Sequence, residues 1–170
     1  EFLARLDESR FGYIVSNVTD SAGRLFPNTH RHQILRVKSA GGTVRIGLIG
    51  LVIDQTAPAW VRFENPIVAA QREVALIKDS VDAVVALTHL TLASDQQLVE
   101  SVPEIVLSLG GHEHENYEIR RGPRFTPIVK ADANIRTVAV VTLTFAAERA
   151  RPTAAVRFVP LDSTIAPDPT

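Results

Sequence analysis

Three histidines in the second half of the sequence have the residue type and spacing of metal ligands. His112 and His114 lie in the segment Gly-Gly-His-Glu-His-Glu over 110–115, and His89 ends an earlier apolar run. Neutral imidazole is a common protein ligand for first-row divalent metals. Because the sequence contains no cysteine, His, Asp, Glu or Asn would have to hold the metal. The pattern therefore predicts a metal site built on His89, His112 and His114.

The segments before these histidines predict that they meet in the fold. Residues 82–90 and 104–109 are nearly continuous apolar runs, typical of parallel strands covered on both faces. Between them we predict a short helix that begins at a capping box over 94–97 and ends before Pro103. A right-handed crossover through this helix would make the two strands parallel neighbours. Their carboxyl ends would then share one edge of the sheet, where ligand sites of open α/β sheets form.

Local geometry predicts which side chains of the histidine segment face the site. In an extended stretch residues two apart point the same way, so His112 and His114 would both face it and Glu113 would point away. Gly110 and Gly111 would let the chain turn sharply and a ligand approach the backbone.

Two carboxylates are predicted to orient the histidine ligands of the site. The second His-x-His, at residues 30–32, is not predicted to bind metal. Asp95 and Glu115 could accept from an imidazole and fix its tautomer. His30 and His32 lie in a polar loop that enters a strand without a partner histidine, so we interpret them as surface residues. A lone His-x-His is also typical of polar loops, which leaves the alternative that the histidines bind no metal.

The rest of the chain predicts an α/β fold with mixed sheets. A domain over 1–160 and a loose tail over 161–170 are expected. Outside the histidine region, helices are predicted over 1–9 and from Asn65-Pro66 onward, where Asn caps and Pro opens the helix, and strands are predicted at 12–18, 32–38, 43–53, 117–120, 126–130, 135–145 and 153–159.

Composition excludes several function classes. The 170 residues are 45% hydrophobic with a formal net charge of −1, which gives no electrostatic argument for a nucleic-acid partner. No apolar run approaches the ~18 residues that a membrane span requires, so no membrane partner is predicted. The chain starts at Glu1 and contains no methionine, so we expect a segment of a longer protein. The compartment is not predicted.

These motifs resemble the second half of calcineurin-like metallophosphoesterases, in the branch of 5′-nucleotidases and 2′,3′-cyclic-nucleotide phosphodiesterases. The resemblance spans nearly the whole chain. It rests on Leu87-Thr88-His89-Leu90, Asp95, Leu98, Pro103, the glycine-histidine segment at 110–114, Ile46-Gly47-Leu48-Ile49-Gly50 and the segments 126–131 and 137–145.

The resemblance implies a four-layer α/β/β/α sandwich and a site for two divalent metals, without distinguishing Mn, Zn, Fe, Mg and Ca. By resemblance, His89 and His112 would bind one metal and His114 the other, and the substrate would be a small phosphoester such as a nucleotide. The family motifs Asp-x-His, Gly-Asp-x-x-Asp and Gly-Asn-His are missing from this chain. The resemblance places them upstream of Glu1, with the remaining ligands and the catalytic histidine.

Two hypotheses follow. The first is a segment of a metal-dependent phosphoester hydrolase that is inactive on its own, because three neutral ligands without a carboxylate would hold a hard divalent ion weakly or bind a single Zn²⁺. The second is a non-catalytic scaffold or interaction half-domain with idle histidines. In either case an exposed sheet edge would favour a dimer or larger assembly.

Overall fold

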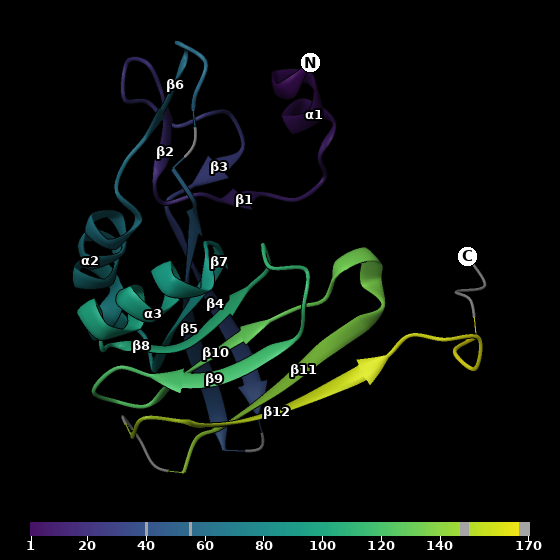
Figure 1. The fold of residues 1–170 in the computed structure, drawn as a ribbon. Coiled ribbons are helices and arrows are strands. Elements are labelled where there is room, and N and C mark those ends of the chain that lie inside the picture. The colour runs from purple at the N-terminus through teal and green to yellow at the C-terminus, as the bar shows by residue number, and fades with distance from the viewer. Residues whose placement is uncertain (40, 55, 147–149, 167–170) are drawn as a thin grey trace.

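A six-stranded mixed sheet forms the centre of the computed structural model, which describes residues 1–39, 41–54, 56–146 and 150–166 (Figure 1). The strand order is β4-β5-β7-β8-β10-β9, in which β5, β7, β8 and β10 are mutually parallel and both outer strands are antiparallel to their neighbours. The strands are β4 (His32–Ser39), β5 (Gly42–Val52), β7 (Ala83–His89), β8 (Ile105–Gly110), β9 (Tyr117–Arg121) and β10 (Thr126–Lys130).

Two helices cover one face of this sheet. They are α2 (Pro66–Ile77), which runs into a 3-10 turn at Lys78–Ser80, and α3 (Leu92–Ser101). Apolar side chains of both helices form one core with alternate residues of the central strands; this core includes Ala70, Val74, Leu98, Ile49, Val84 and Ala86. No helix in the described part of the chain is long and apolar enough to cross a membrane.

A two-stranded ribbon covers the other face. β11 (Thr137–Thr144) and β12 (Thr153–Pro160) pair in antiparallel register, and the inward side chains of the ribbon pack on the strand residues that point away from the helices. Val85 and Leu107 contribute to this second core. The layers are therefore helices, sheet and ribbon, which confirms the predicted α/β class. The ribbon occupies the place of the second sheet in the predicted sandwich.

The strand predicted at 12–18 is interrupted by two buried polar residues. β1 (Tyr13–Ile14) pairs with β3 (Thr29–His30), and β2 (Val18–Asp20) pairs with β6 (Val61–Phe63). The first predicted helix is present as α1 (Phe2–Glu8).

Ser16 and Asn17 account for this interruption. The Ser16 hydroxyl accepts from the Gly50 amide at 3.0 Å, and the Asn17 side chain accepts from the Val52 amide at 3.0 Å and donates to the Val52 carbonyl at 2.8 Å. The end of β5 is thereby satisfied by side chains instead of a continuous backbone ladder. Gly50 is required there because an added Cβ would lie 2.0 Å from the Ile14 carbonyl oxygen.

One predicted boundary was displaced. The predicted capping box at 94–97 is wrong: helix α3 begins at Leu92, and Thr91 is its N-cap, whose hydroxyl accepts from the Ser94 amide at 3.1 Å. Thr91 has the same kind of capping hydroxyl as Ser94 and lies about one helical turn earlier in the sequence, so the helix begins there. A loose tail was predicted over 161–170. Its residues 167–170 lie outside the described part of the chain. At its start, the Leu161 amide donates to the Arg136 carbonyl.

The start of α2 provides a test of the local sequence analysis. The Asn65 side chain accepts from the amides of Ile67 and Val68 at 2.9 and 3.2 Å. We expect Asn65→Ala to lower the free energy of unfolding by about 1 kcal/mol, because these amides lose their acceptor. Urea unfolding followed by circular dichroism measures the change. Asn65→Asp keeps the oxygen and should retain most of the stability; an equal loss in both variants would contradict the capping role.

Candidate metal site at the carboxyl edge of the sheet

Strands β7 and β8 bring two of the three predicted histidines together. They pair in parallel, with Thr88 opposite Gly110, as predicted from their apolar runs. The rings of His89, at the end of β7, and His112, two residues past β8, have centroids 5.3 Å apart at an interplanar angle of 87°. His89 is exposed and His112 half-buried, so both imidazoles are open to a ligand from solvent.

The segment after β8 is bent, which corrects the predicted extended backbone between His112 and His114. His112 has φ of 90° and His114 has φ of 61°, in the left-handed region that residues with a side chain rarely adopt. The sharp turn is therefore made by the histidines and not by the preceding glycines. The alternation of an extended strand therefore does not apply between His112 and His114. Such strained backbone is concentrated at functional sites, which motivates a functional hypothesis for this turn.

Gly110 is needed for packing instead of for turning. A Cβ at this position would lie 2.5 Å from the Thr88 hydroxyl oxygen and 3.2 Å from the Lys130 side chain. Gly111 lies beside the His89 ring. A Cβ added at Gly111 would lie 3.8 Å from His89 Nδ1, which is an ordinary van der Waals contact. The glycines thus let the neighbouring strand and a buried lysine approach the chain just before the histidines.

The remaining predicted site residues do not join the imidazole pair. Among the residues that the structure describes, no three His, Asp or Glu side chains are placed to hold one metal ion. His114 is exposed, and the Glu115 carboxylate accepts from the Tyr117 hydroxyl at 2.8 Å. Asp95 is fully buried and contacts Lys130 and Ser108. The roles of His114 as ligand and of Asp95 and Glu115 in fixing a tautomer stay predictions.

A buried lysine, Lys130, contacts the histidine segment, although it was not predicted from the sequence. The Lys130 side chain, at the end of β10, is 0% exposed, and its ammonium nitrogen lies 2.5 Å from the Asp95 carboxylate and 3.0 Å from that of Glu113. It also donates to the carbonyls of Leu90 at 2.5 Å and Gly111 at 2.9 Å. One cation therefore connects α3, the end of β7 and the histidine turn.

The two carboxylates respond differently to this lysine. Burial raises the pKa of Asp95, although Lys130 and the hydroxyls of Thr88 and Ser108 oppose the shift. Burial acts in the same direction on Glu113, but the Lys130 ammonium and the Leu92 amide, which donates to its carboxylate, lower the pKa of Glu113 overall. Glu113 is thus directed to the lysine, in line with its predicted orientation away from the site.

The signal for Lys130 was present in the sequence. It ends the run Thr-Pro-Ile-Val-Lys, all five residues of which are buried. A lysine in a buried strand requires a carboxylate partner, because an unpaired charge is costly in an apolar interior. The pairing partners could not be chosen from sequence, since Asp95 and Glu113 lie on other elements.

The second His-x-His differs from its prediction in one residue. His30 is exposed as predicted, but His32 is half-buried and its Nδ1 lies 2.7 Å from the Glu73 carboxylate. Glu73 is fully buried on α2 and also accepts from Arg72 at 2.8 Å. The description of His32 as a surface residue was therefore wrong. The alternation of strand β4 places its ring toward the helix side of the sheet.

Lys130 offers a stability test for this cluster. We expect Lys130→Met to lower the free energy of unfolding by about 3–5 kcal/mol, because it leaves the buried Asp95 and the half-buried Glu113 without their cation. Urea unfolding at neutral pH measures the loss. Adding Asp95→Asn, which removes one uncompensated charge, should recover part of it. Lys38→Met, at an exposed position of β4, serves as the control; similar losses in Lys38→Met and Lys130→Met would contradict the role of the cluster.

Comparison with characterised proteins supports the sequence-based resemblance. No protein-family model matches the sequence. The chain is 28% identical to an apyrase of Aedes albopictus over 119 residues, and 27% identical to an apyrase of Anopheles gambiae over 121 residues; each match covers 66% of this chain. The matched regions are 21% and 20% of these relatives, so the chain spans about a fifth of their length.

Solved structures share the fold at lower sequence identity. A 5′-nucleotidase of Staphylococcus aureus superposes with a TM-score of 0.75 at 17% identity, over 98% of this chain and 36% of its own. A 5′-nucleotidase precursor of Thermus thermophilus gives 0.75 at 21% identity, over 94% and 35%, and the sulfate thiohydrolase SoxB of that organism gives 0.74 at 24%, over 89% and 28%. The described elements thus confirm the predicted resemblance: this chain has the fold of the calcineurin-like metallophosphoesterases, in the form found in 5′-nucleotidases.

Proposed function

We propose that this chain is part of a divalent-metal-dependent hydrolase of nucleotides or similar phosphoesters and contributes histidine ligands to its metal site. The observation that supports this most is the contact between His89 and His112 at the carboxyl edge of two parallel strands, in a fold shared with 5′-nucleotidases. His114 is proposed as the ligand of a second metal, as the resemblance implies.

The chemistry of the donors fits part of such a site. Two accessible imidazoles suit a first-row metal ion, and the ring of His112, which lies on a strained backbone, contacts that of His89. Divalent ions bound there would supply positive charge to the phosphate of a substrate. His89 and His112 would hold the ion at this edge, and Lys130 would keep the turn that carries His112 in place through the Gly111 carbonyl.

Space for a phosphoester lies beside the histidines. An open hollow of about 390 Å³ is lined by residues of β5, β7 and β8, among them Leu51, Thr88, His89 and Gly110. The relatives named apyrases and 5′-nucleotidases make a nucleotide the favoured substrate class. We propose that the remaining ligands and the catalytic histidine belong to another part of the whole protein.

A non-catalytic scaffold is the second candidate. It is favoured by the lack of a three-ligand cluster among the described side chains. Metal binding separates the two candidates, because a scaffold with idle histidines would bind divalent metal as well after their replacement as before it.

The metal test uses zinc and the isolated chain. We expect equilibrium dialysis to show that His89→Ala and His112→Ala each weaken Zn²⁺ binding by about tenfold or more, because either change removes a ligand of the pair. His30→Ala removes an exposed histidine from another part of the fold and should bind zinc as the unaltered chain does. Equal binding by all three variants would favour the scaffold.

Activity provides a further prediction. We expect the 170-residue chain to hydrolyse p-nitrophenyl phosphate or AMP in the presence of Mn²⁺ little faster than a metal-only blank, because its described donors lack the carboxylates that hard divalent ions prefer. Phosphate release measured over hours gives the rate. Robust turnover that disappears in His112→Ala would show that the chain contains a complete site.

Association through a sheet edge is proposed for this chain. The outermost strands of the six-stranded sheet are β4 and β9, and β4 exposes Leu35 and Val37. Unpaired edges with apolar side chains favour pairing with another chain. Light scattering coupled to size-exclusion chromatography should show a dimer at high protein concentration; a monomer throughout would contradict this.

A further inference from the structure

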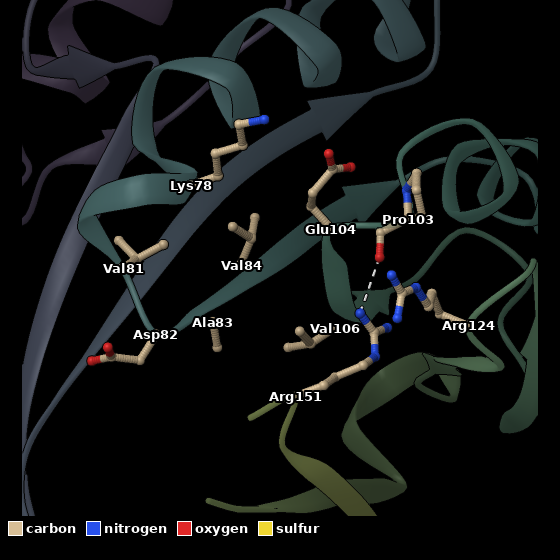
Figure 2. Close-up of a pocket in the computed structure, with 10 residues that line it drawn as sticks. All are labelled: Lys78, Val81, Asp82, Ala83, Val84, Pro103, Glu104, Val106, Arg124 and Arg151. Atoms are coloured by element: carbon tan, nitrogen blue, oxygen red, sulfur yellow. Dashed lines mark hydrogen bonds between the residues drawn. The ribbon is translucent and has the colours of Figure 1, made fainter. Parts of the chain in front are cut away.

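Besides the hollow beside the histidines, the structure contains a pocket with charged side chains at the opposite edge of the sheet. It has a volume of about 300 Å³ and lies where β7 and β8 begin, next to the turn between β9 and β10 and to the start of β12 (Figure 2). Because β7 has seven residues at ~3.3 Å each, this pocket is roughly 20 Å from His89. It is therefore separate from the proposed metal site.

Two guanidinium groups face each other in this pocket. Figure 2 shows that Arg124, from the turn between β9 and β10, and Arg151, which precedes β12, direct their side chains toward one another. Within the described residues, neither arginine forms an ion pair with a carboxylate. Apart from burial, which has the larger effect, the charge of Arg124 lowers the pKa of Arg151, as expected for two like charges close together.

The arginines are held in place by different means. Arg151 donates to the carbonyls of Pro103 at 3.0 Å and Ile105 at 2.8 Å and to the Thr126 hydroxyl at 2.7 Å. These bonds use three of the five N–H donors of a guanidinium, so two remain for a ligand. Arg124 has no hydrogen bond to another described residue, and its position is set by the turn that carries it.

That turn is fixed against helix α3. Gly122 has φ of 75°, and an added Cβ there would lie 2.6 Å from the Val99 carbonyl oxygen. The Phe125 amide donates to the Gly122 carbonyl at 3.2 Å and closes the turn around Arg124. The backbone that carries the arginine is thus preorganised, which lowers the entropic cost of binding a ligand.

The charges of the lining match a dianion. The other charged residues of the lining are Lys78, Glu104 and Asp82, of which Asp82 forms an ion pair with Arg45 outside the pocket. With Arg45 counted beside Asp82, these described side chains and the two arginines of the pocket together carry an excess of two positive charges. The rest of the wall is apolar and includes Val81, Val84, Pro103 and Val106. A pocket of this size, at the low end of ligand sites, exceeds what a single oxyanion needs.

We propose that this pocket binds the phosphate group of a small organic phosphate, with Arg124 and Arg151 on its oxygens and the apolar wall against its organic part. Arg124 can offer a phosphate the paired N–H donors that match its geometry, whereas Arg151 can add single charge-assisted hydrogen bonds from Nε and Nη1. Two guanidinium groups neutralise a phosphate dianion. The group can come from free inorganic phosphate or from a phosphomonoester. The apolar wall favours the monoester.

Calorimetric titration of the chain in EDTA tests this proposal. EDTA removes metal from the histidine edge, so the outcome does not depend on the proposed metal site. The probes are inorganic phosphate and phenyl phosphate, each to about 10 mM, at which a millimolar site fills. We expect phenyl phosphate to bind more tightly; equal affinities would identify free phosphate as the ligand. No heat of binding from either probe would overturn the proposal.

Substitutions locate the binding. We expect Arg124→Gln to weaken phenyl phosphate binding about tenfold, because charge-assisted hydrogen bonds are lost, and Arg124→Glu to abolish it. Arg124 is exposed and donates to no described residue, so the fold should survive both changes. Arg62→Gln, the same charge change at an exposed position on β6, is the control. Unchanged binding in the Arg124 variants, or equal weakening in Arg62→Gln, would overturn the proposal.

Discussion

The ammonium group of Lys130 is the interaction on which the histidine edge depends. A fully buried cation is stable only when its desolvation is offset, and here two carboxylates and two backbone carbonyls surround it. These groups belong to β10, α3, the end of β7 and the turn after β8. The lysine therefore couples the placement of the sheet to that of the turn. The contacts of Lys130 with the turn offset the strain of the left-handed conformation at His112.

The two ends of the parallel strands carry different chemistry. At the carboxyl end, the imidazoles of the exposed His89 and the half-buried His112 meet beside an open hollow and offer nitrogen ligands. At the amino end, the guanidiniums of Arg124 and Arg151 face a smaller pocket with a partly apolar wall. The same sheet separates the two by roughly the length of a strand. Parallel strands make this division possible, because all of their carboxyl ends lie on one side.

This chain shares the fold of 5′-nucleotidases and of the sulfate thiohydrolase SoxB, while its described donors account for only part of the proposed metal site. The superposition with 5′-nucleotidases extends over nearly the whole chain, but only over about a third of theirs. The pair His89 and His112 agrees with a contribution to a larger site. The carboxylates near the pair, Asp95 and Glu113, are engaged by Lys130 instead of facing the imidazoles.

Much of the fold could be predicted from local patterns. The apolar runs that became β7 and β8 predicted neighbouring parallel strands, and Asn65 marked the start of α2, because such signals depend on nearby residues. The boundary at Thr91 was missed because threonine and serine offer the same capping oxygen. The break at Ser16 was missed because its partners lie on β5, distant in sequence.

The sequence by itself determined that His89 and His112 would meet, since two buried strands joined by a helix leave few alternatives. Only the tertiary structure decided how the turn after β8 is shaped. An extended run would have aligned His112 with His114, whereas Lys130 holds the Gly111 carbonyl and Glu113 and the chain bends at both histidines. That constraint comes from the buried ammonium group of Lys130 on β10. A buried charge requires partners nearby in the fold, and these can be distant along the chain.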